Sequence, residues 1–122
     1  MRTAVGFVLL GLMVQPLLVA AQALTPGKYT GNMNFMWVGK PMQEMVTLTL
    51  DKVEGNRIQG VAWVGTKRCQ VDTPVQGQLE GDMLKVTGKA VKEDCGIRWE
   101  MKVVGNKLEG TTPGGSTIVL SK

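Results

Sequence analysis

Residues 28–53 read KYTGNMNFMWVGKPMQEMVTLTLDKV, two arms of alternating character joined by Val38-Gly39-Lys40-Pro41. Glycine at the first central position is typical of a type II′ two-residue loop, which pairs Val38 with Pro41. On one mostly apolar face, this register pairs Trp37 with Met42, Phe35 with Glu44, Met33 with Val46, Gly31 with Leu48 and Tyr29 with Leu50. On the more polar face it pairs Met36 with Gln43, Asn34 with Met45, Asn32 with Thr47, Thr30 with Thr49 and Lys28 with Asp51. The stretch therefore predicts a β-hairpin with one face turned toward a core.

Alternation of apolar and polar side chains continues along the chain and predicts eight strands. Three of them begin after a Gly-Asn or Gly-Asp pair, which is typical of hairpin turns. The expected strands are Lys28–Val38, Met42–Val53, Arg57–Val64, Pro74–Glu80, Met83–Val91, Ile97–Val104, Lys107–Thr112 and Ser116–Ser121. Glycines recur in mid-strand on the inward face, which favours sharp bending. We therefore predict an all-β fold, an eight-stranded antiparallel up-and-down meander forming a small barrel, with a flattened barrel or β-sandwich as the alternative.

The connections of such a meander fall into a short set and a long set. The short connections, all at one end, are Val53-Glu54-Gly55, Gly81-Asp82 and Gly105-Asn106. The other end gathers the Gly39-Lys40 turn, the Gly65–Thr73 and Lys92–Gly96 loops, and the Pro113-Gly114-Gly115 turn. Cys69 and Cys95 lie in the two longest loops, so we expect them to form a disulfide that pins this end.

The first residues predict export. A single Arg2 precedes an uncharged apolar run from Ala4 to Ala21, and Ala21-Gln22-Ala23 is a small-x-small cleavage site. We interpret residues 1–23 as a signal peptide and residues 24–122 as one β-barrel domain, periplasmic or secreted, with no membrane anchor after cleavage. A transmembrane anchor is the alternative, but Gln15 and Pro16 interrupt the run and no basic cluster follows it.

Composition argues against catalysis and against nucleic-acid binding. The chain carries 14 basic and 10 acidic side chains, a net charge of +4, and the charges are scattered rather than clustered. It has no histidine, and its acids form no pairing motif, so we expect a non-enzyme without cofactor or metal. Four methionines, Met33, Met36, Met42 and Met45, surround the first turn, but they alternate between faces, which disfavours a Cu(I) site.

The start of the first strand, Gly27-Lys28-Tyr29, resembles the calycins, in which the lipocalin first strand carries Gly-x-Trp. The segment from Leu24 to Thr30 also resembles the opening of an avidin. Tyr29 replaces the lipocalin tryptophan, and the chain is shorter than a lipocalin. The resemblance implies a barrel that could hold a small hydrophobic ligand. Independently of it, Glu44 and Trp37 lie on the inward face near the loop end, where they would orient such a ligand, although the many inward apolar side chains favour a filled interior.

Two surfaces are candidates for binding a partner. Extending the register into the third strand places Thr47 opposite Val61 and Met45 opposite Trp63 on the outside. Of these residues, Met45, Val61 and Trp63 form an apolar patch with the nearby Met36, unless a β-bulge turns Trp63 inward or the Gly65–Thr73 loop covers it. The second surface is the long-loop end, where the basic residues would steer an acidic partner; they are Lys40, Lys67, Arg68 and Lys92.

The function expected from these observations is an exported, non-catalytic small β-barrel that binds a protein partner, of inhibitor or immunity type, or a second copy of itself. The alternatives are a carrier of a small hydrophobic ligand in the barrel and a structural component of the cell envelope.

Overall fold

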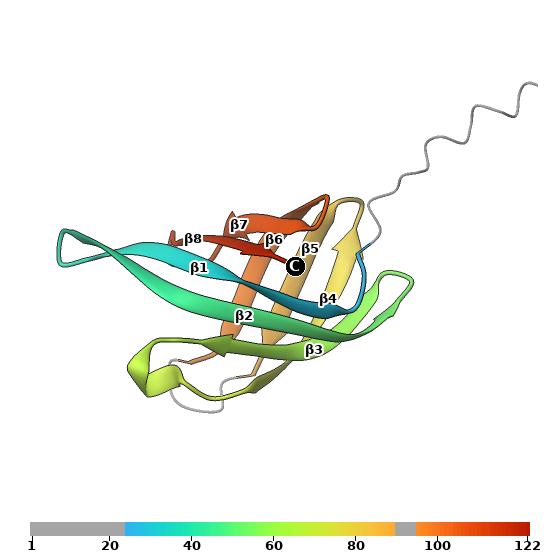
Figure 1. Ribbon diagram of the computed structural model, residues 1–122, viewed down its shortest axis with the longest axis horizontal. Coiled ribbons are helices and arrows are strands. Elements are labelled where there is room, and N and C mark those ends of the chain that lie inside the picture. The colour runs from blue at the N-terminus through green and yellow to red at the C-terminus, as the bar shows by residue number, and fades with distance from the viewer. Residues whose placement is uncertain (1–23, 90–94) are drawn as a thin grey trace, which may run out of the picture.

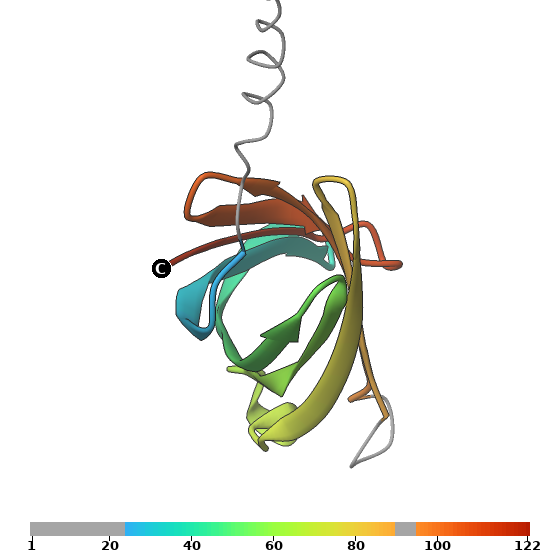
Figure 2. The same ribbon diagram turned by 90° about the vertical axis from the view of Figure 1, so that its right-hand side faces the viewer.

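The computed structural model describes residues 24–89 and 95–122, and eight antiparallel strands in them form a closed barrel in which neighbours in sequence are neighbours in space. The strands are β1 (Gly27–Trp37), β2 (Lys40–Glu54), β3 (Arg57–Val64), β4 (Thr73–Glu80), β5 (Met83–Gly88), β6 (Ile97–Val104), β7 (Lys107–Thr111) and β8 (Thr117–Ser121). One short 3-10 helix, η3 (Lys67–Cys69), lies between β3 and β4. The pairing of β1 with β8 completes the ring (Figures 1 and 2). The predicted fold class is confirmed, while the expected signal peptide lies outside the described residues.

The register of the first hairpin differs from the prediction. Trp37 pairs with Lys40 and Met36 with Pro41, so the loop is Val38-Gly39 rather than Gly39-Lys40. The residues flanking a two-residue loop exchange both backbone hydrogen bonds, and the predicted pairing of Val38 with Pro41 would have required an N–H that proline lacks. Because the shift is two residues, every side chain keeps its predicted face.

The turn between β1 and β2 has positive φ at both central residues, 49° at Val38 and 77° at Gly39. This is the type I′ combination, whose twist matches that of the flanking strands. The prediction of type II′ was therefore wrong. The first residue of each short connection at the other end, Gly55, Gly81 or Gly105, has positive φ as expected for a glycine-first loop.

A second register difference lies between β2 and β3. Val46 pairs with Val64 and Leu50 with Gly60, but Lys52 then pairs with Gln59, so a β-bulge lies at Asp51. The bulge absorbs one residue and makes the connection a two-residue loop, Gly55-Asn56, instead of Val53-Glu54-Gly55. Trp63 is consequently opposite Thr47, not Met45, and Val61 is opposite Thr49.

The barrel interior is packed with apolar side chains contributed by all eight strands. The largest fully buried ones are Leu48, Leu50, Leu84, Met101, Leu108, Ile118, Leu120, Val46 and Val86. Tyr29 and Trp99 are also buried, as predicted. Two inward glycines permit close strand approach: a Cβ on Gly31 would lie 1.8 Å from the Val119 carbonyl oxygen, and one on Gly110 would lie 1.8 Å from that of Glu100. These glycines allow the small sheet to close.

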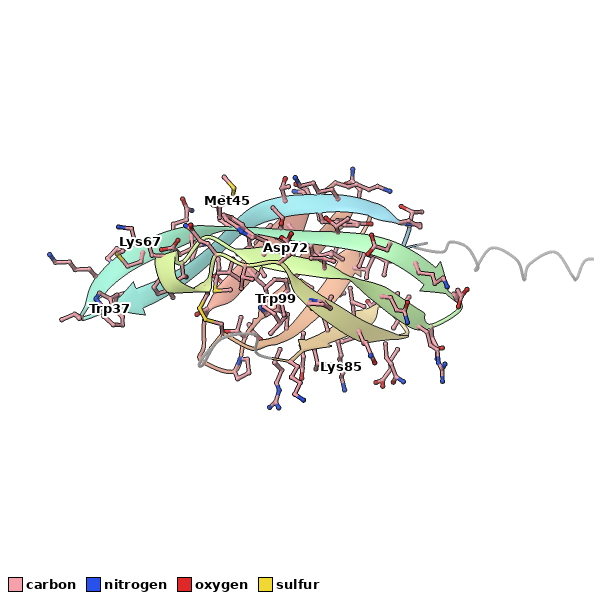
Figure 3. The ribbon with its side chains drawn as sticks, turned by 90° about the horizontal axis from the view of Figure 1, so that it is seen from below. Trp37, Met45, Lys67, Asp72, Lys85 and Trp99 are labelled. Carbon is pink, nitrogen blue, oxygen red and sulfur yellow. A yellow bond between two sulfur atoms is a disulfide. The ribbon has the colours of Figure 1, made fainter. Side chains whose placement is uncertain are left out.

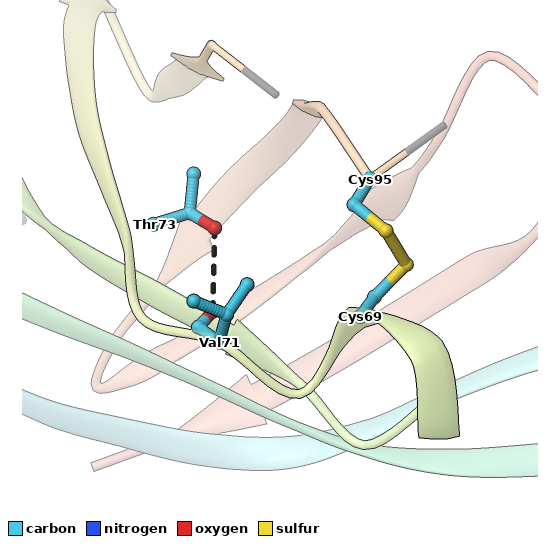
Figure 4. The surroundings of a disulfide bond; sticks show 4 residues. All are labelled: Cys69, Val71, Thr73 and Cys95. Carbon is cyan, nitrogen blue, oxygen red and sulfur yellow. Dashed lines mark hydrogen bonds between the residues drawn. A yellow bond between two sulfur atoms is a disulfide. The ribbon is translucent and has the colours of Figure 1, made fainter. Parts of the chain in front are cut away.

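The predicted disulfide is confirmed. Cys69, at the end of η3, is bonded to Cys95, which precedes β6, with 5.5 Å between their Cα atoms (Figure 4). Beside it, the buried Thr73 hydroxyl donates a hydrogen bond of 3.3 Å to the Val71 carbonyl oxygen. The cross-link ties the loop after β3 to the start of β6 and is consistent with an oxidising compartment.

Candidate functional site

The β1–β2 hairpin extends beyond the rest of the barrel. β8 pairs with β1 only as far as Asn34, and β3 pairs with β2 only from Val46 onward. Residues 35–44 are therefore a two-stranded ribbon, here called the arm, which projects past the other strands at that end (Figure 1). A two-stranded hairpin has little core of its own, so its side chains are available to other molecules.

The arm concentrates exposed apolar side chains. Of the eight large hydrophobic residues that are exposed in the described parts of the chain, five lie in the arm or at its root; they are Met36, Trp37, Val38, Met42 and Met45. Trp37 was expected to point into the barrel, but 64% of its surface is exposed and it lies at the outer end of the arm (Figure 3). The expectation failed because neither β8 nor β3, the described neighbours of β1 and β2, reaches this part of the hairpin to form an interior around it.

The predicted outer patch is present in part. Met45 is 59% exposed, and its carbonyl accepts a hydrogen bond of 2.8 Å from the Gly65 N–H, which places Met45 diagonal to Trp63. Trp63 and Val61 are half-buried on the outside, since their inward neighbour Ala62 is fully buried. The bulge at Asp51 therefore does not turn Trp63 inward.

Met36 lies on the same outer face, farther along the arm. A polar pair separates it from Met45: the Gln43 side-chain amide donates a hydrogen bond of 3.0 Å to the Asn34 side-chain oxygen. These two amides satisfy each other, so the polar pair adds little desolvation cost to an apolar contact. We call Met36, Met45, Val61 and Trp63 the outer patch.

A cavity of about 330 Å³ lies at the barrel mouth beneath the disulfide. Most of its lining residues are apolar, and the others are one arginine, two threonines and one glycine. The lining residues are Met33, Val64, Thr66, Cys69, Cys95, Gly96, Ile97, Arg98, Trp99, Thr112 and Pro113. The volume lies at the lower end of the range for small-molecule sites. Met33 connects this cavity to the inner face of the arm, because it belongs to β1 just before the arm begins.

The structure does not bring the two expected ligand-orienting residues together. Glu44 is half-buried opposite Met33, beside the cavity rather than in its wall, whereas Trp37 is at the exposed end of the arm. Among the expected steering residues, Lys40 is exposed beside Trp37 and Lys67 is exposed on η3, at the same end of the barrel. Arg68 also belongs to η3. Lys92 lies outside the described residues.

Within residues 24–89 and 95–122, no group of three His, Cys, Asp or Glu side chains could hold a metal ion. Met33 and Met42 are on one face of the hairpin and Met36 and Met45 on the other, as the sequence predicted. No helix in that same part of the chain is long and apolar enough to cross a membrane.

The exposure of Trp37 and Val38 at the tip of the arm was not predicted, although the chain contains a signal for it. Phe35-Met36-Trp37-Val38 are four consecutive apolar residues, and a strand places successive side chains on opposite faces. Such a run cannot be buried on one face alone. No family model, curated protein or solved structure matches this chain.

Proposed function

We propose that the chain is a non-catalytic binding protein, periplasmic or secreted, whose partner is another protein, of inhibitor or immunity type. The observation that carries the proposal is the outer patch, where the exposed Met45 lies diagonal to the half-buried Trp63. Methionine and tryptophan are enriched at protein interfaces, and a tryptophan already held in place loses little entropy on binding. The lack of histidine supports a non-catalytic role.

The barrel supports this proposal because it is a rigid scaffold for the residues of the outer patch on β2 and β3. Strands β2 and β3 hold Met45, Val61 and Trp63 beside pairs that run without a break from Val46 with Val64 to Leu50 with Gly60, and the inner faces of the same strands contribute fully buried Val46, Leu48 and Ala62. The surface is thus largely preformed, which lowers the ordering cost of association. Lys40 and Lys67 at the same end would accelerate encounter with an acidic partner.

Met45→Lys tests the proposal. We expect it to weaken association with the partner, or self-association, by about tenfold or more, because a charge replaces an apolar contact at the interface centre. The free energy of unfolding should change by less than about 0.5 kcal/mol, since Met45 is exposed. Native mass spectrometry of protein purified from its own source identifies the bound mass, and titration of that partner gives the affinity.

Met83→Lys is the matched control. Met83 is an exposed methionine on β5, next to the Gly81-Asp82 turn at the opposite end of the barrel. It introduces the same charge away from the outer patch, so association should be unaffected. Equal affinities for the Met45→Lys, Met83→Lys and wild-type proteins would reject the outer patch as the interface.

A hydrophobic-ligand carrier is the second candidate, favoured by the cavity at the barrel mouth. The calycin resemblance of the first strand supports this alternative, because calycin-like barrels would bind ligands at such a mouth. The packed interior restricts the ligand to a small molecule held at the mouth rather than deep in the barrel. The same mass spectra distinguish the two candidates, since a retained small mass indicates the carrier and a retained protein indicates the binder.

A further inference from the structure

The end of the arm is apolar on both faces. Phe35 and Trp37 lie on one face with Met42, and Met36 lies on the other. Val38, in the turn itself, is 83% exposed. A protein surface that received one face would leave the apolar side chains of the other face in water. Apolar groups on all sides instead suit a medium that surrounds the end of the arm.

The turn conformation retains an apolar side chain where a polar one would fit better. Val38 has φ of 49°, and the first central position of a type I′ turn favours asparagine, aspartate or glycine. A β-branched residue in this region is strained. Strain of this kind concentrates at functional sites, because the residue is retained for something other than stability.

The outer edge of β2 disfavours the addition of a partner's strand. The Met45 carbonyl points away from β1, toward Gly65, and alternate residues of a strand point their backbone groups the same way. Pro41 is therefore on the outward set, where its missing N–H interrupts any new ladder. The same missing donor leaves fewer unsatisfied backbone groups when this part of the arm leaves water.

Charge and length also fit a lipid surface. Lys40 is the only charged side chain between Lys28 and Glu44, and its long stem can keep the ammonium among phosphates while the turn is buried. Beyond Asn34, β1 continues for three residues to Trp37, or about 10 Å at roughly 3.4 Å per residue. Interfacial elements typically insert to a depth of about 5–10 Å.

We propose that the end of the arm docks on an anionic lipid bilayer, with Trp37 and Val38 at the boundary of the acyl chains and Lys40 at the phosphates. The contact is peripheral, because the arm is too short to span a bilayer. It goes beyond the proposed protein binding and depends on the arm's turn, not on Met45 and Trp63 of the outer patch.

Vesicle binding monitored by tryptophan emission tests this proposal. Trp37 is exposed, whereas Trp63 is half-buried and Trp99 is buried, so a blue shift on binding would report mainly on Trp37. We expect the shift with vesicles of phosphatidylcholine and phosphatidylglycerol, and a smaller one with phosphatidylcholine alone. Trp37→Phe should remove the shift but retain sedimentation with vesicles, because phenylalanine preserves the apolar end of the arm.

Val38→Asp and Val104→Asp form the decisive pair. Both valines are exposed and both variants add one negative charge, but Val104 precedes the Gly105-Asn106 turn at the opposite end of the barrel. Val38→Asp should lower the vesicle partition coefficient by about tenfold or more relative to Val104→Asp. The two variants are compared in the full chain and again in the chain that begins at Leu24. Within each comparison they differ only in the substitution, so any contribution of residues 1–23 is the same for both.

Failure of the wild-type chain from Leu24 to bind either vesicle would overturn the proposal. Equal losses in the two variants would also overturn it, because they would reflect only general charge attraction. A Trp37 blue shift that appears with a protein partner but not with vesicles would assign the end of the arm to that protein. Loss of vesicle binding with unchanged partner affinity in Val38→Asp would support separate roles for the arm's turn and the outer patch.

Discussion

At the scale of single residues, Val38 shows a conflict between backbone preference and surface chemistry. Pro41 has no N–H to donate, so it cannot flank the two-residue loop, and the loop is Val38-Gly39. The positive φ of Val38 follows from its position in that loop. Once the loop is Val38-Gly39, the first central residue must adopt a left-handed conformation that valine accepts poorly.

Val38→Asn should therefore stabilise the protein. Asn-Gly is the preferred type I′ sequence, and relief of the strain is worth about 1 kcal/mol. The same change makes the end of the arm more polar, so vesicle binding should weaken while the midpoint of urea unfolding rises. An unchanged or lower midpoint would show that Val38 is not strained in this turn.

At the scale of elements, the sequence predicted the eight strands but not how far each is covered by its neighbours. Alternation identifies which residues form a strand and which face they occupy, and the core residues Leu48 and Leu50 are buried as predicted. The alternation does not reveal that Pro41 lacks a backbone N–H, nor that a bulge lies at Asp51. Each of these features shifted a strand register. Coverage of the arm depends on where β3 and β8 end in space, so its exposure could not be predicted from β1 and β2 alone.

The disulfide joins two segments whose proximity was predicted from their positions in the sequence. The cross-link runs from the end of the 3-10 helix η3 to the residue just before Gly96 and the start of β6, and it closes a loop between cysteines 26 positions apart. The position of both cysteines in long loops at one end was a sufficient signal, because strand count determines which loops share an end.

Replacing both cysteines by serine should lower the free energy of unfolding by about 2–4 kcal/mol, because the unfolded chain regains the entropy of the open loop. Urea unfolding of wild type with reductant provides the control, and its midpoint should approach that of the double variant. Affinity for a partner of the outer patch should be retained while the protein remains folded. Indistinguishable midpoints with and without the disulfide would show that other contacts hold this end.

At the scale of the whole molecule, the barrel depends on a seam between the first and last strands. β1 and β8 pair from Thr30 with Ser121 to Asn34 with Thr117, and this is the most distant pairing along the chain. Strands β1 and β2 continue past the closed ring as the arm. The seam ends at Asn34, so the place where β8 stops pairing with β1 is also the place where the arm becomes exposed.

Gly31→Ala tests the seam. The added methyl group would lie 1.8 Å from the Val119 carbonyl oxygen and 2.9 Å from the Leu120 Cα, both in the backbone of β8, so the strands must separate. We expect the free energy of unfolding to fall by about 3 kcal/mol or more, and the amides of β8 to lose protection from hydrogen exchange before those of β4 and β5.

Gly114→Ala is the control for the change in chain entropy that every glycine-to-alanine substitution brings. Among the residues that the structure describes, a Cβ on Gly114 would meet only the Thr112 hydroxyl, at 4.0 Å, and the φ of Gly114 is not positive. Stability should therefore remain the same or rise by up to about 1 kcal/mol. Similar stability changes in the two variants would mean that the seam tolerates a side chain at Gly31, and that barrel closure does not depend on the close approach of β1 to β8.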